Sequence, residues 1–157
     1  MQKITPCLWF DTEGEEAANF YTSVFPNSKI VNVTRYGEAG PRPAGMVMTV
    51  EFVLDGQEYT ALNGGPEFPF TEAISLQIHC ATQEEADEYW DRLTEGGQPG
   101  PCGWLKDRYG MSWQVVPTEL ERLLQDPDPG RAQRAMAAMM QMSRIDVAAV
   151  RKAADQA

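Results

Sequence analysis

The feature that most constrains this chain is an internal repeat, because two matching halves predict two similar structural units. Shifting the sequence by 69 positions places Glu15-Glu16-Ala17 on Glu84-Glu85-Ala86 and Phe20-Tyr21 on Tyr89-Trp90. In both segments the apolar residues recur at helical spacing. A strand-like run precedes each segment in the same register. We therefore interpret the chain as a duplication, rather than as two amphipathic helices that resemble each other by chance.

The two repeated helices are predicted at about 12–25 and 82–96. Thr82 followed by Glu85 is a capping-box pattern, in which the threonine hydroxyl accepts a hydrogen bond from the backbone at the start of the helix. Thr12 stands in a similar position before the first helix. The sequence therefore predicts that both helices begin with a threonine cap.

Strand-like runs surround each predicted helix. Asp55-Gly56 separates two alternating runs and is a strong hairpin signal. A sheet of this kind has one face covered by its helix and one face free. The fold class is therefore α+β: two βαβββ modules forming a curved mixed sheet with a cleft on its free face, plus a C-terminal helical tail. The predicted strands are 4–10, 28–36, 46–54 and 57–63 in the first module, and 73–80, 98–101, 103–106 and 111–116 in the second.

The remaining residues break the repeat and read as a helical extension. Met136, Met139, Met140 and Met142 make a soft apolar surface there. We expect the extension to lack a core of its own and to pack on the sheet or on a second subunit, which favours a homodimer. The predicted organisation is a single domain, 1–157, with module one at 3–66, module two at 72–117 and the helical extension at 118–157.

Charge and cysteine content exclude several classes of function. The net charge of −10 disfavours nucleic acid, since binding to it rests on Lys and Arg displacing counterions. The three cysteines include no C-x-x-C pair and read as reduced thiols. The N-terminus does not read as a secretion leader, and no apolar run approaches the length of a membrane span. We therefore predict a cytoplasmic protein that contacts neither nucleic acid nor membrane.

Several motifs resemble those of the vicinal-oxygen-chelate superfamily, which includes glyoxalase I, extradiol dioxygenases and bleomycin-resistance proteins. The similarity is closest to its PhnB-like branch, often labelled demethylubiquinone-methyltransferase-like, and it runs over nearly the whole chain. The resemblance implies paired βαβββ modules and often a homodimer. The motifs are Leu8-Trp9-Phe10-Asp11, Phe20-Tyr21 with Phe25-Pro26-Asn27-Ser28, Thr34-Arg35-Tyr36, the run from Ala61 to Pro66, and the two segments Cys102–Asp107 and Gly110–Gln114.

The resemblance also implies four positions for metal ligands, at the first and last strands of each module. Metal-using members place His, Glu or Gln there. In this chain the positions become Pro6, Ser75, Gln114 and a residue at or near Asn63. Proline cannot ligate through its side chain, and the other three are weak neutral ligands. No metal site and no cofactor are therefore predicted, and a divalent metal is disfavoured.

Two residues are candidates for catalysis, although the sequence does not identify the catalytic residues. Strand alternation places His79 on one face with Ser75 and Gln77, toward the expected cleft. A single histidine is more often a hydrogen-bonded structural residue, so both readings stay open. Glu51 interrupts an apolar strand and lies opposite Thr60. It is either a carboxylate in the cleft that acts as a base or a residue that faces solvent.

The other candidates are aromatic and polar residues of the expected cleft. Either Trp104 or Trp113 forms the floor of the cleft, or both pack in the core. Cys102 is an ordinary thiol or a nucleophile, with Lys106 as the one nearby activating group. No strand–Gly-rich loop–helix motif supports binding of S-adenosylmethionine. The predicted ligand-binding residues are Phe10, Asn63, Ser75, Gln77, His79, Trp104 and Gln114.

Three classes of function follow. The missing ligands favour a small-molecule-binding protein without the superfamily's metal tetrad. The alternative is an isomerase-, lyase- or dioxygenase-like enzyme, metal-dependent or using Glu51 and His79, that acts on a small oxygenated metabolite. A scaffold whose trough is filled by side chains is the third.

Overall fold

The computed structural model describes residues 2–156. The chain forms two compact units, one ending at Phe70 and the other beginning at Thr71. Within the described residues, no helix has both the length and the apolar character needed to cross a membrane.

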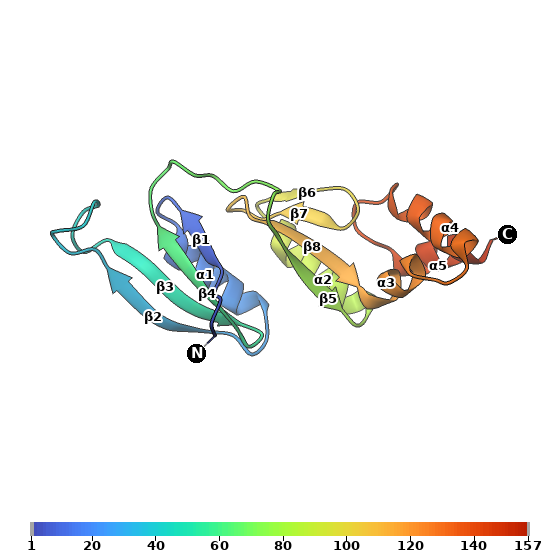
Figure 1. Ribbon diagram of the computed structural model, residues 1–157, viewed down its shortest axis with the longest axis horizontal. Helices are drawn as coiled ribbons and strands as arrows, with labels where there is room; N and C mark the ends of the chain where they lie inside the picture. The colour runs from blue at the N-terminus through green and yellow to red at the C-terminus, as the bar shows by residue number, and fades with distance from the viewer. Residues whose placement is uncertain (1, 157) are drawn as a thin grey trace. The chain divides into compact units, whose positions relative to one another are not determined.

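The first unit is a four-stranded sheet with a helix on one face (Figure 1). The strand order is β1-β4-β3-β2, with β1 parallel to β4 and the other neighbours antiparallel. Helix α1 packs against β3, where Tyr21 and Phe52 are fully buried side chains. The elements are β1 (Cys7–Phe10), α1 (Gly14–Val24), β2 (Lys29–Arg35), β3 (Val47–Leu54) and β4 (Gln57–Asn63).

The second unit repeats this topology, with strand order β5-β8-β7-β6 and β5 parallel to β8. Helix α2 packs against β7 and β8, and Trp90 and Leu93 are the large residues that it buries. The elements are β5 (Ser75–Cys80), α2 (Gln83–Thr94), β6 (Gln98–Pro99), β7 (Trp104–Lys106) and β8 (Ser112–Pro117). The predicted duplication of a βαβββ module is therefore confirmed.

The register of the repeat differs from the prediction in the first strand of each module. Phe10 at the end of β1 is buried, whereas His79, which lies 69 positions later, is exposed. The buried residue at the end of β5 is Cys80, which lies 70 positions after Phe10. Ile78 is buried as well and lies 70 positions after the buried Leu8. The helices keep the offset of 69, so the connection between strand and helix is one residue longer in the first module.

The two helices also begin differently. Thr82 caps α2 as predicted, because its hydroxyl oxygen accepts a hydrogen bond of 3.1 Å from the backbone N–H of Glu85. The predicted cap at Thr12 is wrong. The longer connection moves the helix start to Gly14, whose N–H donates to Oδ1 of Asn63 at 2.8 Å.

The C-terminal extension forms a small hydrophobic cluster of its own, contrary to our expectation. Ala135, Val150 and Ala154 are completely buried in it, together with Leu120 and Leu123. Three short helices suffice because their apolar faces meet one another. They gather where β8 ends (Figure 1) and are α3 (Thr118–Leu124), α4 (Pro129–Met139) and α5 (Val147–Asp155).

The extension is also fastened to α2. The side-chain amide of Gln83 donates to the carbonyl of Ile145 at 2.8 Å, and its oxygen accepts from the N–H of Val147 at 2.9 Å. The predicted methionine surface is divided. Met139 and Met142 pack against the extension's own cluster, whereas Met136 and Met140 remain 41% and 56% exposed.

Candidate ligand site on the second module

A polar row crosses the face of the second sheet that α2 leaves uncovered. Gln114 on β8 lies between Gln77 on β5 and Trp104 on β7 in the strand register. The amide of Gln114 donates to the hydroxyl of Ser75 at 2.8 Å, and the amide of Gln77 donates to Gln114 at 3.4 Å. The structure thus brings together four of the seven predicted ligand-binding residues.

A pocket of about 440 Å³ lies at the edge of this row. Its volume falls within the range typical of small-molecule sites. The walls combine proline, glycine and indole surfaces with a few polar side chains. The lining residues are Glu72, Gln98, Pro99, Gly100, Pro101, Cys102, Trp104, Leu105, Lys106 and Ser112.

Ser112 is the most informative residue of the pocket. It is 1% exposed, and its hydroxyl is the one buried side-chain polar atom without a hydrogen-bond partner among the described residues. It pairs with Ser75 on one side and Lys106 on the other, so its side chain shares the uncovered face. Buried hydroxyls almost always have a partner, so the hydroxyl of Ser112 is a candidate contact for a ligand or water.

Sequence reasoning missed Ser112, although a signal for it exists. Gln114 is identified by its match to a family position, and the period of two in a strand places Ser112 on the same face. A serine in an apolar strand carries no chemical signature of its own. Its isolation from hydrogen-bond partners becomes visible only when the neighbouring strands are in place.

Lys106 and Glu72 supply a charge pair at the pocket. The ammonium nitrogen lies 2.6 Å from the glutamate Oε1, and both side chains are about half exposed. The hydrogen bond from Lys106 lowers the pKa of Glu72 below its ordinary value. An ammonium group has three N–H donors, so Lys106 retains donors beyond the one that faces Glu72.

A tight loop between β6 and β7 forms one wall. The N–H of Gly100 donates to the carbonyl of Trp104 at 2.8 Å, and the N–H of Trp104 donates back to Pro101 at 3.0 Å. Cys102 in this loop is partly exposed, and its sulfur lies 3.7 Å from that of Met140. Among the described residues, none of the hydrogen-bond partners of Cys102 is a base that would activate it as a nucleophile.

The histidine points to a different neighbour. His79 shares the uncovered face of β5 as predicted, but its Nδ1 lies 3.2 Å from the carboxylate of Glu121 on α3. It is half exposed and does not line the pocket. His79 therefore links strand β5 to helix α3 of the C-terminal extension.

Glu51 belongs to the first unit. It is exposed on β3 and pairs with Thr60 across the hairpin, as the sequence predicts. The hollow that it lines, with Thr5 and Val31, has a volume of about 140 Å³. Glu51 is thus a solvent-exposed carboxylate beside a small hollow, and it is not buried.

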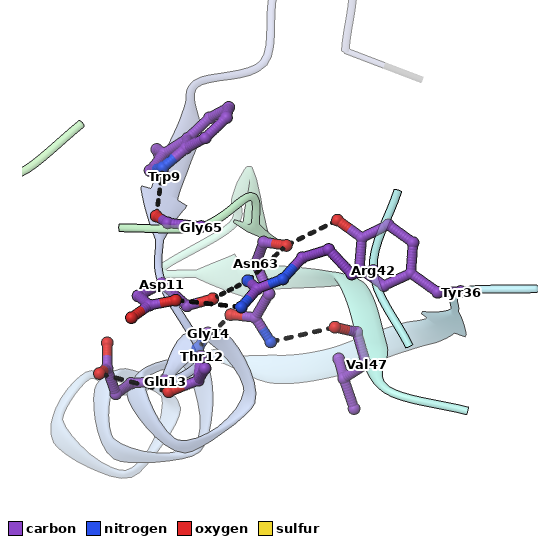
Figure 2. Close-up of polar contacts among 10 residues, drawn as sticks. All are labelled: Trp9, Asp11, Thr12, Glu13, Gly14, Tyr36, Arg42, Val47, Asn63 and Gly65. Carbon is purple, nitrogen blue, oxygen red and sulfur yellow. Dashed lines mark hydrogen bonds and ion pairs between the residues drawn. The ribbon is translucent and has the colours of Figure 1, made fainter. Parts of the chain in front are cut away.

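Asn63 connects β4 to the start of α1 and to β3 (Figure 2). It is 2% exposed, and besides accepting from Gly14 its side chain donates to the carbonyl of Val47 at 3.1 Å. The hydroxyl of Tyr36 donates to the backbone carbonyl of Asn63 at 2.6 Å. The side chain predicted to bind ligand is therefore engaged within the first unit.

Phe10 is likewise a core residue of the first unit. It is 3% exposed and meets the ring of Phe70 edge-on, with 5.2 Å between the ring centroids. The extra residue before α1 turns this side chain to the buried face of β1. The structure therefore places Phe10 in the core rather than on the uncovered face where the sequence predicts it.

The donors at the four inherited metal positions do not fit a divalent metal. Ser75 and Gln114 are hydrogen-bonded to each other, and Asn63 faces α1. Pro6 offers only its carbonyl, which accepts from the N–H of Thr60. Among residues 2–156, no three His, Cys, Asp or Glu side chains are grouped so as to hold a metal ion.

The fold and these motifs define a protein of the vicinal-oxygen-chelate class, with two βαβββ modules. Over residues 2–116 the chain matches the family described as 3-demethylubiquinone-9 3-methyltransferase. The chain belongs to this family and is one of its PhnB-like members. No curated protein is significantly similar to it.

Solved structures support the assignment. A putative 3-demethylubiquinone-9 3-methyltransferase, PhnB protein, from Bacillus cereus is 41% identical, with a TM-score of 0.66; the match covers 74% of this chain and 99% of that one. A Pseudomonas aeruginosa protein is 22% identical, with a TM-score of 0.61, and the match covers 74% and 98% of the chains. A fosfomycin resistance protein from Listeria monocytogenes, complexed with Mn(II) and sulfate, is 16% identical, with a TM-score of 0.54 and coverage of 80% and 98%. The last two share the fold alone.

Proposed function

We propose that this protein binds a small molecule in the pocket of its second module without a protein-bound metal. The observation that carries the proposal is the buried, unpartnered hydroxyl of Ser112 at the wall of that pocket. The neighbouring polar row supports it, because Ser75 and Gln114 satisfy each other instead of presenting free ligands.

The chemistry of the walls indicates an apolar ring compound that carries an oxygen acceptor. Trp104 and Lys106 are two positions apart on β7, so both side chains stand on the same face. Two residues of a strand span about 7 Å. Ser112 is directly opposite Lys106 on β8. A ring resting on the indole of Trp104 brings a substituent oxygen toward two donors, the hydroxyl of Ser112 and the ammonium of Lys106.

Charge favours an uncharged ligand over an anion. Glu72 already neutralises Lys106, so this pair contributes no surplus positive charge to the pocket. The chain carries a net charge of −10, which repels anions. A ketone or similar neutral oxygen accepts hydrogen bonds from Lys106 and Ser112 without displacing Glu72.

Two isosteric probes test this chemistry. We would measure the dissociation constants of methyl 2-naphthyl ketone and 2-naphthoate by NMR titration in the presence of EDTA. The ketone is expected to bind more tightly than the carboxylate. Ser112→Ala is expected to weaken the ketone by about 2- to 10-fold, since one hydrogen bond contributes about 0.5–1.5 kcal/mol. Equal or stronger binding of naphthoate would overturn the neutral-ligand proposal.

A second serine substitution serves as the control for the effect of Ser112→Ala on ketone binding. Ser28 is a partly exposed serine in the first unit and does not line the pocket. Ser28→Ala is expected to leave binding of the ketone unchanged. Ser112→Ala should leave the free energy of unfolding equal or slightly higher, because it removes an unpaired buried hydroxyl. An unchanged ketone affinity in Ser112→Ala would show that this residue does not contact the ligand.

Neither candidate for catalysis lines this pocket. Glu51 is exposed in the first unit, and His79 is paired with Glu121. The methyltransferase activity in the family's description is not part of our proposal, because the segments that join β1 to α1 and β5 to α2 contain no glycine-rich loop before the helix.

A further inference from the structure

The C-terminal extension lies beyond the part of the chain that matches its family. That match ends at residue 116. The Bacillus cereus structure is covered over 99% of its length by 74% of this chain. Helices α3, α4 and α5 are therefore additions to the module pair that these relatives share.

The extension is hydrogen-bonded to the wall of the ligand pocket. The N–H of Cys102 donates to the carbonyl of Met142, and the N–H of Gly103 donates to that of Ser143, both at 2.8 Å. The hydroxyl of Ser143 donates back to the carbonyl of Gly100 at 2.6 Å. Three hydrogen bonds thus join Met142-Ser143 to the loop 100–103, and residues 100–102 of this loop line the pocket.

The loop has a backbone conformation that needs this support. The φ angle is 57° at Cys102 and 84° at Gly103. A non-glycine residue in this region is strained. A Cβ at Gly103 would approach Ile145 of the extension to 3.1 Å and the carbonyl oxygen of Val115 to 2.9 Å. The loop is therefore held closely between β8 and the extension.

We propose that the C-terminal extension is a positioning element for the ligand pocket. Through Met142 and Ser143 it fixes the loop 100–103, and the position of that loop sets which ligands the pocket admits. The hydrogen bonds alone support this fixed position of the loop. Selection of ligands by the loop rests in addition on the proposed function.

Hydrogen exchange tests the loop without any ligand. We would compare amide exchange at Cys102 and Gly103 in the wild type and in Ser143→Ala, which removes the hydrogen bond to Gly100. Exchange is expected to accelerate by about 2- to 10-fold, as the loss of one hydrogen bond implies. Arg151→Ala is the matched control, because it breaks an exposed ion pair with Glu119 elsewhere in the extension. Unchanged exchange in Ser143→Ala would overturn the positioning role.

Ligand binding tests the second half of the proposal. Ser143→Ala is expected to weaken binding of methyl 2-naphthyl ketone by about 2- to 10-fold, while Arg151→Ala leaves it unchanged. Gln83→Ala, which frees Ile145 and Val147 from α2, should act in the same direction. Faster exchange with unaltered affinity would overturn the claim that the loop selects ligands. If the wild type binds neither probe, the proposed function fails. The exchange experiment still shows whether the extension fixes the position of the loop 100–103.

Discussion

Two buried polar residues show how a structural side chain differs from a candidate binding group. The side chain of Asn63 has partners for both its oxygen and its nitrogen, whereas the hydroxyl of Ser112 has none among the described residues. Burying a polar group without a hydrogen bond costs free energy that folding must recover elsewhere. We therefore assign Asn63 to the fold and Ser112 to the proposed site.

Replacing Asn63 tests its structural role. Asn63→Ala is expected to lower the free energy of unfolding by about 2 kcal/mol, because it removes the side chain that caps α1 and deprives the Val47 carbonyl of its donor. Urea unfolding followed by circular dichroism measures this. The control is Thr12→Ala, since Thr12 does not cap α1. It should change stability by less than about 0.5 kcal/mol, as surface substitutions usually do. Equal effects of the two substitutions would contradict the assignment of the cap.

Cys80 provides a test in pH. Burial raises the pKa of its thiol from an ordinary 9.0 to about 12. We therefore expect Cys80 to resist iodoacetamide at pH 8 in the folded protein and to react once urea unfolds the chain, as peptide mass spectrometry would show. The unfolded thiol loses its proton first, so this group lowers stability as pH rises from about 9 toward 12. Rapid alkylation of Cys80 in the native protein would refute the burial.

At the scale of elements, the helices were more predictable than the strands that meet them. Apolar spacing located α1 and α2 to within about two residues, and the Asp55-Gly56 turn located the β3–β4 hairpin. The register of β1 was not predictable, because one extra residue before α1 reverses which side chains face the helix. That single residue places Phe10 in the core instead of the predicted cleft.

The connection from α2 to β6 depends on a glycine that permits close approach. A Cβ at Gly97 would lie 2.1 Å from the carbonyl oxygen of Lys106. Gly97→Ala is expected to separate β6 from β7 and to lower stability by about 1–3 kcal/mol, the usual cost of overpacking. Gly37→Ala is the control, because a Cβ there meets nothing within 4 Å. Thermal unfolding compares the two, and a neutral Gly97→Ala would be inconsistent with this packing.

At the scale of the whole molecule, the duplication and the family were readable from sequence, but the candidate pocket was not. Motif matching and strand alternation pointed to Ser75, Gln77, Trp104 and Gln114, which the second sheet brings together. The pocket depends on the loop 100–103, which is hydrogen-bonded to an extension that the repeat does not contain. Contacts between segments so far apart in the sequence leave no local pattern.

The homodimer stays a prediction. Met136 and Met140 remain exposed on α4 and at its end. Residues four apart on a helix are neighbours, and a contiguous apolar patch is the kind of surface that marks an interaction site. Met139, predicted as part of the same surface, is engaged in the extension's own cluster. If the exposed pair forms the interface, Met136→Lys with Met140→Lys should yield a monomer in sedimentation velocity, while Lys152→Glu leaves assembly unchanged. A wild type that is monomeric at high micromolar concentration would refute the dimer.

One NMR titration can show whether the second module binds its ligand without a metal. Methyl 2-naphthyl ketone would be added to ¹⁵N-labelled protein in EDTA, and the spectrum followed for backbone amides and tryptophan indoles. We expect shifts at Trp104, Ser112 and the loop 100–103 in the absence of any free divalent metal. Shifts that cluster around Glu51 instead, or binding that appears only when Mn²⁺ replaces EDTA, would contradict it.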